Sequence, residues 1–252
     1  EKSSGKGVKN SRAKEPENKL KVFLMSHSYE IEIKSLLGSK ERQEKLKADL
    51  RTLDPNMKLL QKTKRLNHYF VGGSLPALFE ALKGRVLPEK VESLREITAK
   101  FEEKNCSIRS KWVDGKVSLV VKAAIGEGNS VHGTARLEFD SPVSGLTLEQ
   151  VDKAILGCGF RYQAKWSQER EEYECGDMTV TIDFSPGYGY MAEFEIVSPS
   201  EELIGAHREK LRETMRVLGA PEAQPERLER MFAFYNSHWQ DYYGTEKVFV
   251  LD

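Results

Sequence analysis

Residues 28–34 read SYEIEIK, and this stretch decides the fold. Ile31 and Ile33 alternate with Glu30, Glu32 and Lys34, and β-branched residues with a period of two are typical of a β-strand. Successive side chains of a strand point to opposite faces, so one face of this strand is Ile and the other is Glu, Glu and Lys. An ionic face of this kind either meets solvent or lines an interior.

The composition narrows the class of protein. The chain has 252 residues, enough for one large domain or two small ones with a sizeable core. Charged residues make up 31% and balance to a net charge of zero, so no nucleic-acid partner is expected. No run of about 18 apolar residues occurs, so no membrane segment is expected. Three scattered cysteines are typical of a reducing compartment, so we expect a cytoplasmic protein. Its oligomeric state, monomer or homodimer, stays open.

Three regions are expected along the chain. Residues 1–24 have almost no large apolar side chains and indicate a disordered basic tail or a non-native extension, with a polyanion-binding arm as the alternative. Residues 25–200 form a strand-rich domain with a helical insert at about 74–104, and 201–252 form helices and a short final strand. These last helices either buttress the apolar outer face of the sheet or cap one end of it, and we favour buttressing.

Strands outnumber helices in the periodicity of the chain. The expected strands are 28–34, 66–72, 106–113, 117–125, 133–140, 161–174, 178–184 and 190–197. The expected helices are 39–54, 74–84, 88–104, 147–157, 200–218 and 225–243. Hairpin signals such as Asp114-Gly115 join neighbouring strands. This pattern predicts an antiparallel α+β domain, most simply a β-barrel flanked by helices.

Most of these strands repeat the division into one apolar and one ionic face. A half-buried sheet with its charges in water explains any single strand. A solvent face is usually a mixture of polar residues, whereas formal charges of both signs dominate here. The other arrangement is a barrel whose charged face points inward. The ionic-face residues are Glu30, Glu32, Lys34, Arg109, Lys111, Lys122, Arg136, Glu138, Asp140, Asp183, Glu193 and Glu195.

Charges enclosed in an interior need partners, because burying so many of them unpaired is prohibitive. Carboxylate oxygens are the ligands that Mg²⁺ and Mn²⁺ prefer. Lysine and arginine suit a chain of phosphates. An interior with seven acids and five bases therefore indicates a site for a divalent metal and a polyphosphate.

The ordered motifs resemble the CYTH domain family, the triphosphate tunnel metalloenzymes. The first three matches are EIEIK at 30–34 with the family's ExExK signature, LNHYF at 66–70 with its second strand, and SIRSKW at 107–112 with its R-x-R strand. LVVKA at 119–123 resembles the strand with a phosphate-binding lysine, and RLEFD at 136–140 resembles R-x-E-x-E with Asp in the last place.

The resemblance continues to about residue 200. REEY at 170–173 resembles a strand that carries an Arg before a Tyr, and IDFSPGYGYMAEFEIV at 182–197 resembles the family's D…GxG…ExE segment. Lys111 stands where the family has a second Arg. The family usually has two bases close before the Tyr, whereas here Gln168 and Glu169 intervene, so that Arg170 is the firm match and Lys165 is a loose one.

The resemblance implies an eight-stranded antiparallel barrel around a charged tunnel. It implies a metal, Mg²⁺ or Mn²⁺, held by Glu30, Glu32, Glu138, Asp183, Glu193 and Glu195. It implies triphosphate binding by Lys34, Arg109, Lys111, Lys122, Arg136, Lys165 and Arg170. The expected catalytic residues are Glu138 and Asp140, either of which would orient water, together with Lys34.

The function expected first is a metal-dependent triphosphatase. Its substrate would be a small molecule that contains a triphosphate: inorganic triphosphate, thiamine triphosphate or a nucleoside triphosphate. The alternative is a class IV adenylyl cyclase, which uses the same metals and bases to convert ATP to cyclic AMP and pyrophosphate. A third hypothesis, a non-catalytic polyphosphate or nucleotide sensor, is disfavoured because an anion binder has little use for so many acids.

Overall fold

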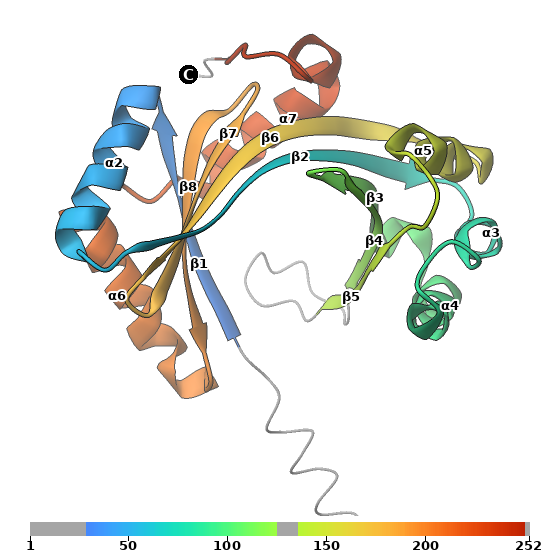
Figure 1. Ribbon diagram of the computed structural model, residues 1–252, viewed down its shortest axis with the longest axis horizontal. Helices are drawn as coiled ribbons and strands as arrows, with labels where there is room; N and C mark the ends of the chain where they lie inside the picture. Colours follow the sequence, from blue (N-terminus) through green and yellow to red (C-terminus); the bar gives the residue numbers. More distant parts are fainter. Residues whose placement is uncertain (1–28, 125–135, 250–252) are drawn as a thin grey trace, which may run out of the picture.

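The computed structural model describes residues 29–124 and 136–249, which form an eight-stranded antiparallel sheet with helices on its outside (Figure 1). The strand order is β1-β8-β7-β6-β2-β3-β4-β5. The strands are β1 (Tyr29–Gly38), β2 (Lys58–Gly72), β3 (Cys106–Val113), β4 (Lys116–Ala124), β5 (Arg136–Pro142), β6 (Phe160–Cys175), β7 (Met178–Ser185) and β8 (Gly189–Ser198). The helices are α2 (Lys40–Leu53), α3 (Leu75–Leu82), α4 (Val91–Lys100), α5 (Leu148–Gly157), α6 (Ile204–Val217) and α7 (Pro225–Tyr242), with short 3₁₀ turns at Pro88–Lys90, Glu103–Asn105 and Glu201–Leu203.

The α+β class and the eight antiparallel strands confirm the sequence-based prediction. The largest difference in a boundary is β2, which begins at Lys58 rather than at residue 66. The expected final strand is reduced to a single bridge between Gly187 and Val248. The tail expected at 1–24 and parts of the expected strands, at 125, 133–135 and 250–252, lie outside the described residues.

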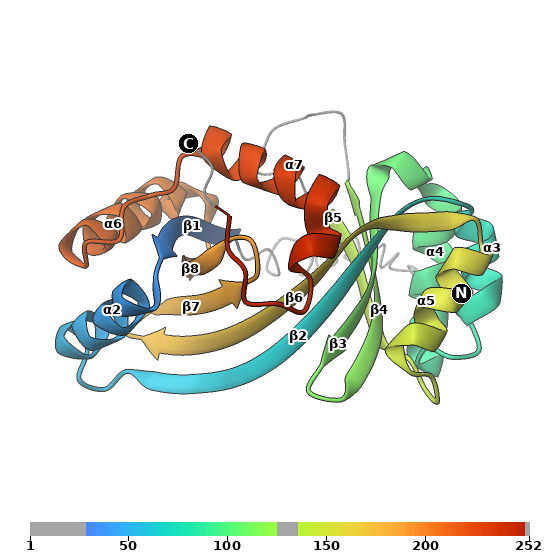
Figure 2. The ribbon, with the colours of Figure 1, turned by 90° about the horizontal axis from the view of Figure 1, so that it is seen from above.

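The long antiparallel pair of β2 and β6, which we call the ribbon, carries one half of the sheet at each end. The sheet therefore curls into an open arch. β2 and β6 pair along nearly their whole length. β7 pairs only with residues 169–175 of β6, and β3 pairs only with residues 65–70 of β2. β1 and β5 end the strand order, and no pairing joins them within the described residues. Figure 1 shows them on opposite sides of the arch, and Figure 2 shows the ribbon running between the two halves.

Helices cover the convex side of each half. In one half, α2 and α6 pack on β1 and β8, and buried Ile31 and Ile33 lie in that core. In the other half, α3, α4 and α5 cover β3–β5, where Ile108 and Leu119 are fully buried. Because side chains alternate, the charged faces of the same strands line the concave side of the arch. Within the described part of the chain, no helix is both long and apolar enough to cross a bilayer.

The two C-terminal helices have different roles. α6 buttresses the convex face, as the sequence favours, through Leu211 and Met215. α7 instead covers the edge of β6 that β7 leaves unpaired (Figure 2). The hydroxyl of Tyr235 donates to the Lys165 carbonyl at 2.8 Å, and the Tyr235 ring stacks on Trp166 with 3.8 Å between centroids. α7 thus satisfies polar groups that an open strand edge would leave to water.

A partly buried ion cluster joins α2 to the convex side of the ribbon. Glu171 accepts hydrogen bonds from Lys47 at 3.0 Å, Lys62 at 2.8 Å and the hydroxyl of Tyr173 at 2.7 Å. Burial disfavours the carboxylate, but these three donors outweigh burial and lower the pKa of Glu171 from 4.5 to about 2. Its contribution to stability is therefore complete above about pH 4.5 and is lost as the pH falls toward 2.

We expect Glu171→Gln to lower the free energy of unfolding at pH 7 by about 1–2 kcal/mol, because the charged acceptor of three donors is lost. The difference between native protein and variant should shrink as the pH falls from 4.5 toward 2. Urea unfolding at a series of pH values measures both. The matched control is Glu174→Gln, since its pair with Lys58 is exposed and should contribute under about 1 kcal/mol. Equal losses in the two variants would contradict the cluster's role.

Candidate functional site

Four glutamates gather on the concave face where β1 pairs with β8. We call Glu30, Glu32, Glu193 and Glu195 the acidic quartet. Glu32 lies opposite Glu195, and Lys34 lies opposite Glu193. Lys34 binds Glu32, and its Nζ is 3.2 Å from Glu193 Oε1. One lysine does not neutralise four carboxylates, so the quartet keeps an excess of negative charge.

Two pKa shifts report this excess. Burial works against the charged form of Lys34, but Glu193 and Glu32 outweigh burial and raise its pKa. Burial, followed by the charges of Glu30 and Glu32, raises the pKa of Glu195. A cation bound at the quartet would relieve this repulsion.

The chemistry of the quartet fits a hard divalent cation, because its donors are carboxylate oxygens. Glu30 and Glu32 are exposed, whereas Glu193 and Glu195 are half-buried. Across residues 29–124 and 136–249, no three His, Cys, Asp or Glu side chains converge as metal ligands. The quartet thus has the donors and the charge for a metal, and its side chains would have to rotate to coordinate one.

An arginine connects the quartet to the central ribbon. Arg170 on β6 donates to Asp183 on β7 through Nε at 2.7 Å and through Nη2 at 2.5 Å. Its Nη2 also lies 3.3 Å from Glu193. Burial alone would lower the pKa of Arg170, but Asp183 and Glu193 raise it. Asp183, which the resemblance implies as a metal ligand, is only 1% exposed and has both oxygens bound to the guanidinium.

A second group of charges lies in the other half of the arch. Lys111 on β3 binds Asp140 on β5, and Lys122 on β4 lies 2.9 Å from Glu138 on β5. β5 is at the far end of the strand order from β1. Figure 1 shows β5 and β1 on opposite sides of the arch, and no group of three metal-ligating side chains joins Glu138 to the acidic quartet among the described residues, although the resemblance implies one metal site for all of them. Arg136 also lies on β5, opposite Ala124 on β4.

Two arginines between these groups have no carboxylate partner among the described residues. Arg109 Nη1 donates to the Tyr69 hydroxyl at 2.9 Å, and Arg65 Nε donates to Thr63 Oγ1 at 2.9 Å. Burial, followed by the positive charge of Arg170, lowers the pKa of Arg65. Arg65 was not expected at the site because this strand was predicted to begin at residue 66.

The structure places the side chain of Lys165 on the face opposite to Arg170, away from the other expected phosphate-binding residues. Its Nζ is 4.1 Å from the centroid of the Tyr162 ring and 4.0 Å from Asp152 Oδ2. Asp152 also accepts from Tyr162 and lies 2.7 Å from His68 Nδ1, so the carboxylate belongs to a buried network on the convex side. Lys165 and Arg170 are an odd number of residues apart, and alternation places them on opposite faces.

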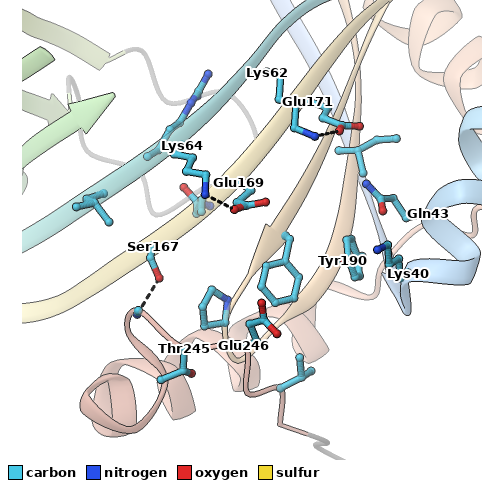
Figure 3. A pocket seen from close by; sticks show the side chains of 18 of the residues that line it. Lys40, Gln43, Lys62, Lys64, Ser167, Glu169, Glu171, Tyr190, Thr245 and Glu246 are labelled. Atoms are coloured by element: carbon cyan, nitrogen blue, oxygen red, sulfur yellow. Dashed lines mark hydrogen bonds and ion pairs between the residues drawn. The ribbon is translucent and has the colours of Figure 1, made fainter. Parts of the chain in front are cut away.

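A pocket of about 940 Å³ lies on the convex side, between α2, the ribbon and the segment after α7 (Figure 3). Two of its lysines face carboxylates: Lys64 is 3.0 Å from Glu169, and Lys62 is 2.8 Å from Glu171. These ion pairs compensate charges that a phosphate would need, although Arg65 also lines the pocket. The concave face, where Arg109 has no carboxylate partner among the described residues and the acidic quartet keeps an excess of negative charge, is the stronger candidate for the functional site.

Known structures share this architecture. The PH1819 protein of Pyrococcus horikoshii OT3 is 19% identical over 82% of this chain and 99% of its own, with a TM-score of 0.51. A conserved hypothetical protein of Pyrococcus furiosus is 19% identical over 77% of this chain and 93% of its own, with a TM-score of 0.50. At this identity the likeness shows the fold alone. A protein from Hippeastrum, named for adenylyl cyclase and for a dominant triphosphatase activity, is 16% identical over 83% of this chain and 96% of its own, with a TM-score of 0.44.

Sequence comparison identifies the family. No curated protein matches the chain. The family model for the CYTH domain matches residues 28–227, which include all eight strands, α2 to α6 and the start of α7. The chain therefore belongs to the CYTH domain family.

Proposed function

We propose that the protein is a divalent-metal-dependent triphosphatase that cleaves the terminal phosphate of a substrate bound along the concave face. The observation that carries this proposal is the separation of charge on that face. The acidic quartet lies at one end, and bases follow along the ribbon and the opposite half. A polyphosphate with its metal has the complementary distribution of charge. Membership of the CYTH family supports the same proposal.

The bases would bind the phosphate chain. Arg170, Arg109, Lys111 and Lys122 present guanidinium and ammonium donors to one side of the arch, and an arginine fork suits phosphate oxygens. Lys111 and Lys122 now bind Asp140 and Glu138, so an incoming phosphate would compete for them. Freed in this way, either carboxylate could accept a proton from an attacking water.

The acidic quartet would hold Mg²⁺ or Mn²⁺, and Lys34, which lies 3.2 Å from Glu193, would bind the phosphates beside it. A bound divalent ion supplies neutralisation of the charge that develops on the leaving phosphates. The same machinery would serve a class IV adenylyl cyclase, so the identity of the products separates the two functions.

Release of orthophosphate from inorganic triphosphate tests the proposal. We expect turnover of inorganic triphosphate with Mg²⁺ or Mn²⁺. Turnover should be lost in excess EDTA, because without a cation nothing neutralises the charge of the acidic quartet or of the leaving phosphates. No turnover of inorganic triphosphate, thiamine triphosphate or ATP with either metal would contradict an enzymatic function.

We expect Lys122→Ala to weaken binding of inorganic triphosphate by about tenfold, since a charged hydrogen bond contributes about 1.5–3 kcal/mol. Lys153→Ala is the matched control, because Lys153 lies exposed on α5 on the convex side. Isothermal titration calorimetry in EDTA measures both affinities. Equal effects of the two substitutions would refute the concave face as the binding surface.

A further inference from the structure

Arg65 occupies the junction between the two halves of the arch. It is the first residue of β2 to pair with β3, where it lies opposite Val113. On the other side it lies opposite Gln168, the residue immediately before β6 begins to pair with β7 at Glu169. Arg65 therefore lies between the strands that carry the two groups of charges.

Arg65 also completes a row of bases along the ribbon. Arg170 is two residues from Gln168 on β6, and Lys111 lies opposite Asn67, two residues from Arg65 on β2. Residues two apart on a strand share a face and are roughly 6–7 Å apart. Residues that are directly paired across an antiparallel ladder also share a face. The row therefore runs from Arg170 through Arg65 to Lys111, across three strands.

The side chain of Arg65 is half-buried and has donors to spare. Its Nε donates to Thr63 Oγ1, and its two Nη groups have no hydrogen-bond partner among the described residues. A guanidinium carries five N–H donors, and those that Arg65 leaves unpaired are not buried, so a ligand can reach them. An anion that reaches the concave face would satisfy them.

The residue opposite Arg65 on β6 is neutral. The amide of Gln168 is held by neutral partners: Asn67 donates to it at 3.3 Å, and it donates to Ser185 Oγ at 3.1 Å. Arg65 is thus the one charged member of this cross-strand pair.

We infer that Arg65 is a substrate-binding residue that grips the phosphate chain between the two halves of the site and supplies from β2 the charge that Gln168 lacks. This inference rests on the proposed function and adds a residue to it. If Arg65 acts in this way, affinity for triphosphate depends on a positive charge at the junction, whether β2 or β6 carries that charge.

The test is binding of inorganic triphosphate by isothermal titration calorimetry in EDTA. We expect Arg65→Gln to raise Kd about tenfold, the effect of losing one charged hydrogen-bonding group. Moving the charge across the ladder in Arg65→Gln with Gln168→Lys should recover most of this loss. Lys64→Gln is the matched control, because Lys64 is the neighbouring base on the convex side and pairs with Glu169; its affinity should not change.

The outcomes separate the inference from the proposal beneath it. If the native protein binds triphosphate and Lys122→Ala weakens binding but Arg65→Gln does not, the role of Arg65 is refuted and the proposed function stands. If Arg65→Gln weakens binding and the relocated lysine recovers nothing, a charge at the junction is not what matters and the inference fails. If the native protein binds no triphosphate with or without Mg²⁺, both fail.

Discussion

Replacing Glu30 and Glu32 together with glutamine should abolish divalent-dependent turnover while the fold is kept. The two substitutions preserve shape but remove two of the four charges of the acidic quartet, on which the metal site depends. Both side chains are exposed, so neither loss leaves a buried group unsatisfied. Lys34 keeps Glu193 as a partner. We expect kcat to fall at least about a hundredfold, the scale of losing an electrostatic element of an active site.

Two measurements make this prediction specific. Binding of Mn²⁺, followed by electron paramagnetic resonance, should weaken in the same variant, which separates loss of metal from loss of chemistry. Glu80→Gln with Glu92→Gln is the matched control, because both acids lie exposed on helices of the other half. Full activity in the quartet variant, or an equal loss in the control, would contradict the metal assignment.

Arg170→Met should destabilise the protein by about 3–5 kcal/mol, the range found when one partner of a buried ion pair is removed. The substitution keeps the volume of the stem but strips Asp183 of both its hydrogen bonds to the guanidinium. Asp183 is only 1% exposed, so water cannot replace them. Urea unfolding measures the loss.

A second substitution identifies the cause of this loss of stability. Arg170→Met with Asp183→Asn removes the stranded charge and should be less than half as destabilised as Arg170→Met alone. Arg216→Met is the matched control, because Arg216 binds Glu213 through two hydrogen bonds on the exposed side of α6. Surface pairs contribute about 0–1 kcal/mol. A loss in Arg170→Met no larger than in this control would show that the buried pair contributes no more than a surface pair.

The features of the fold that could be predicted from the sequence follow mostly from the alternation of side chains along each strand. The period of two in EIEIK places Ile31 and Ile33 in the core and Glu30, Glu32 and Lys34 on the other face, and the structure has this division. The same rule places Lys165 and Arg170 on opposite faces, because the two are five positions apart.

Other features depend on which strands pair and in which register, and the sequence of a single strand does not reveal this. Asp183 looks like a free ligand in the sequence, and only the register of β6 with β7 places it opposite Arg170. Arg65 was missed because the polar first half of β2, from Lys58 to Arg65, lacks the apolar alternation that marks a half-buried strand. The offset between β7 and β3 along the ribbon, which opens the arch, is likewise set by which residues pair.

Product analysis tests the central claim most directly. The protein is incubated with Mg²⁺ or Mn²⁺ and either inorganic triphosphate or ATP, and the products are resolved by phosphorus NMR. Our account predicts orthophosphate from inorganic triphosphate, with no signal in EDTA. Cyclic AMP with pyrophosphate from ATP, without orthophosphate from triphosphate, would contradict the hydrolase and establish the cyclase on the same concave face.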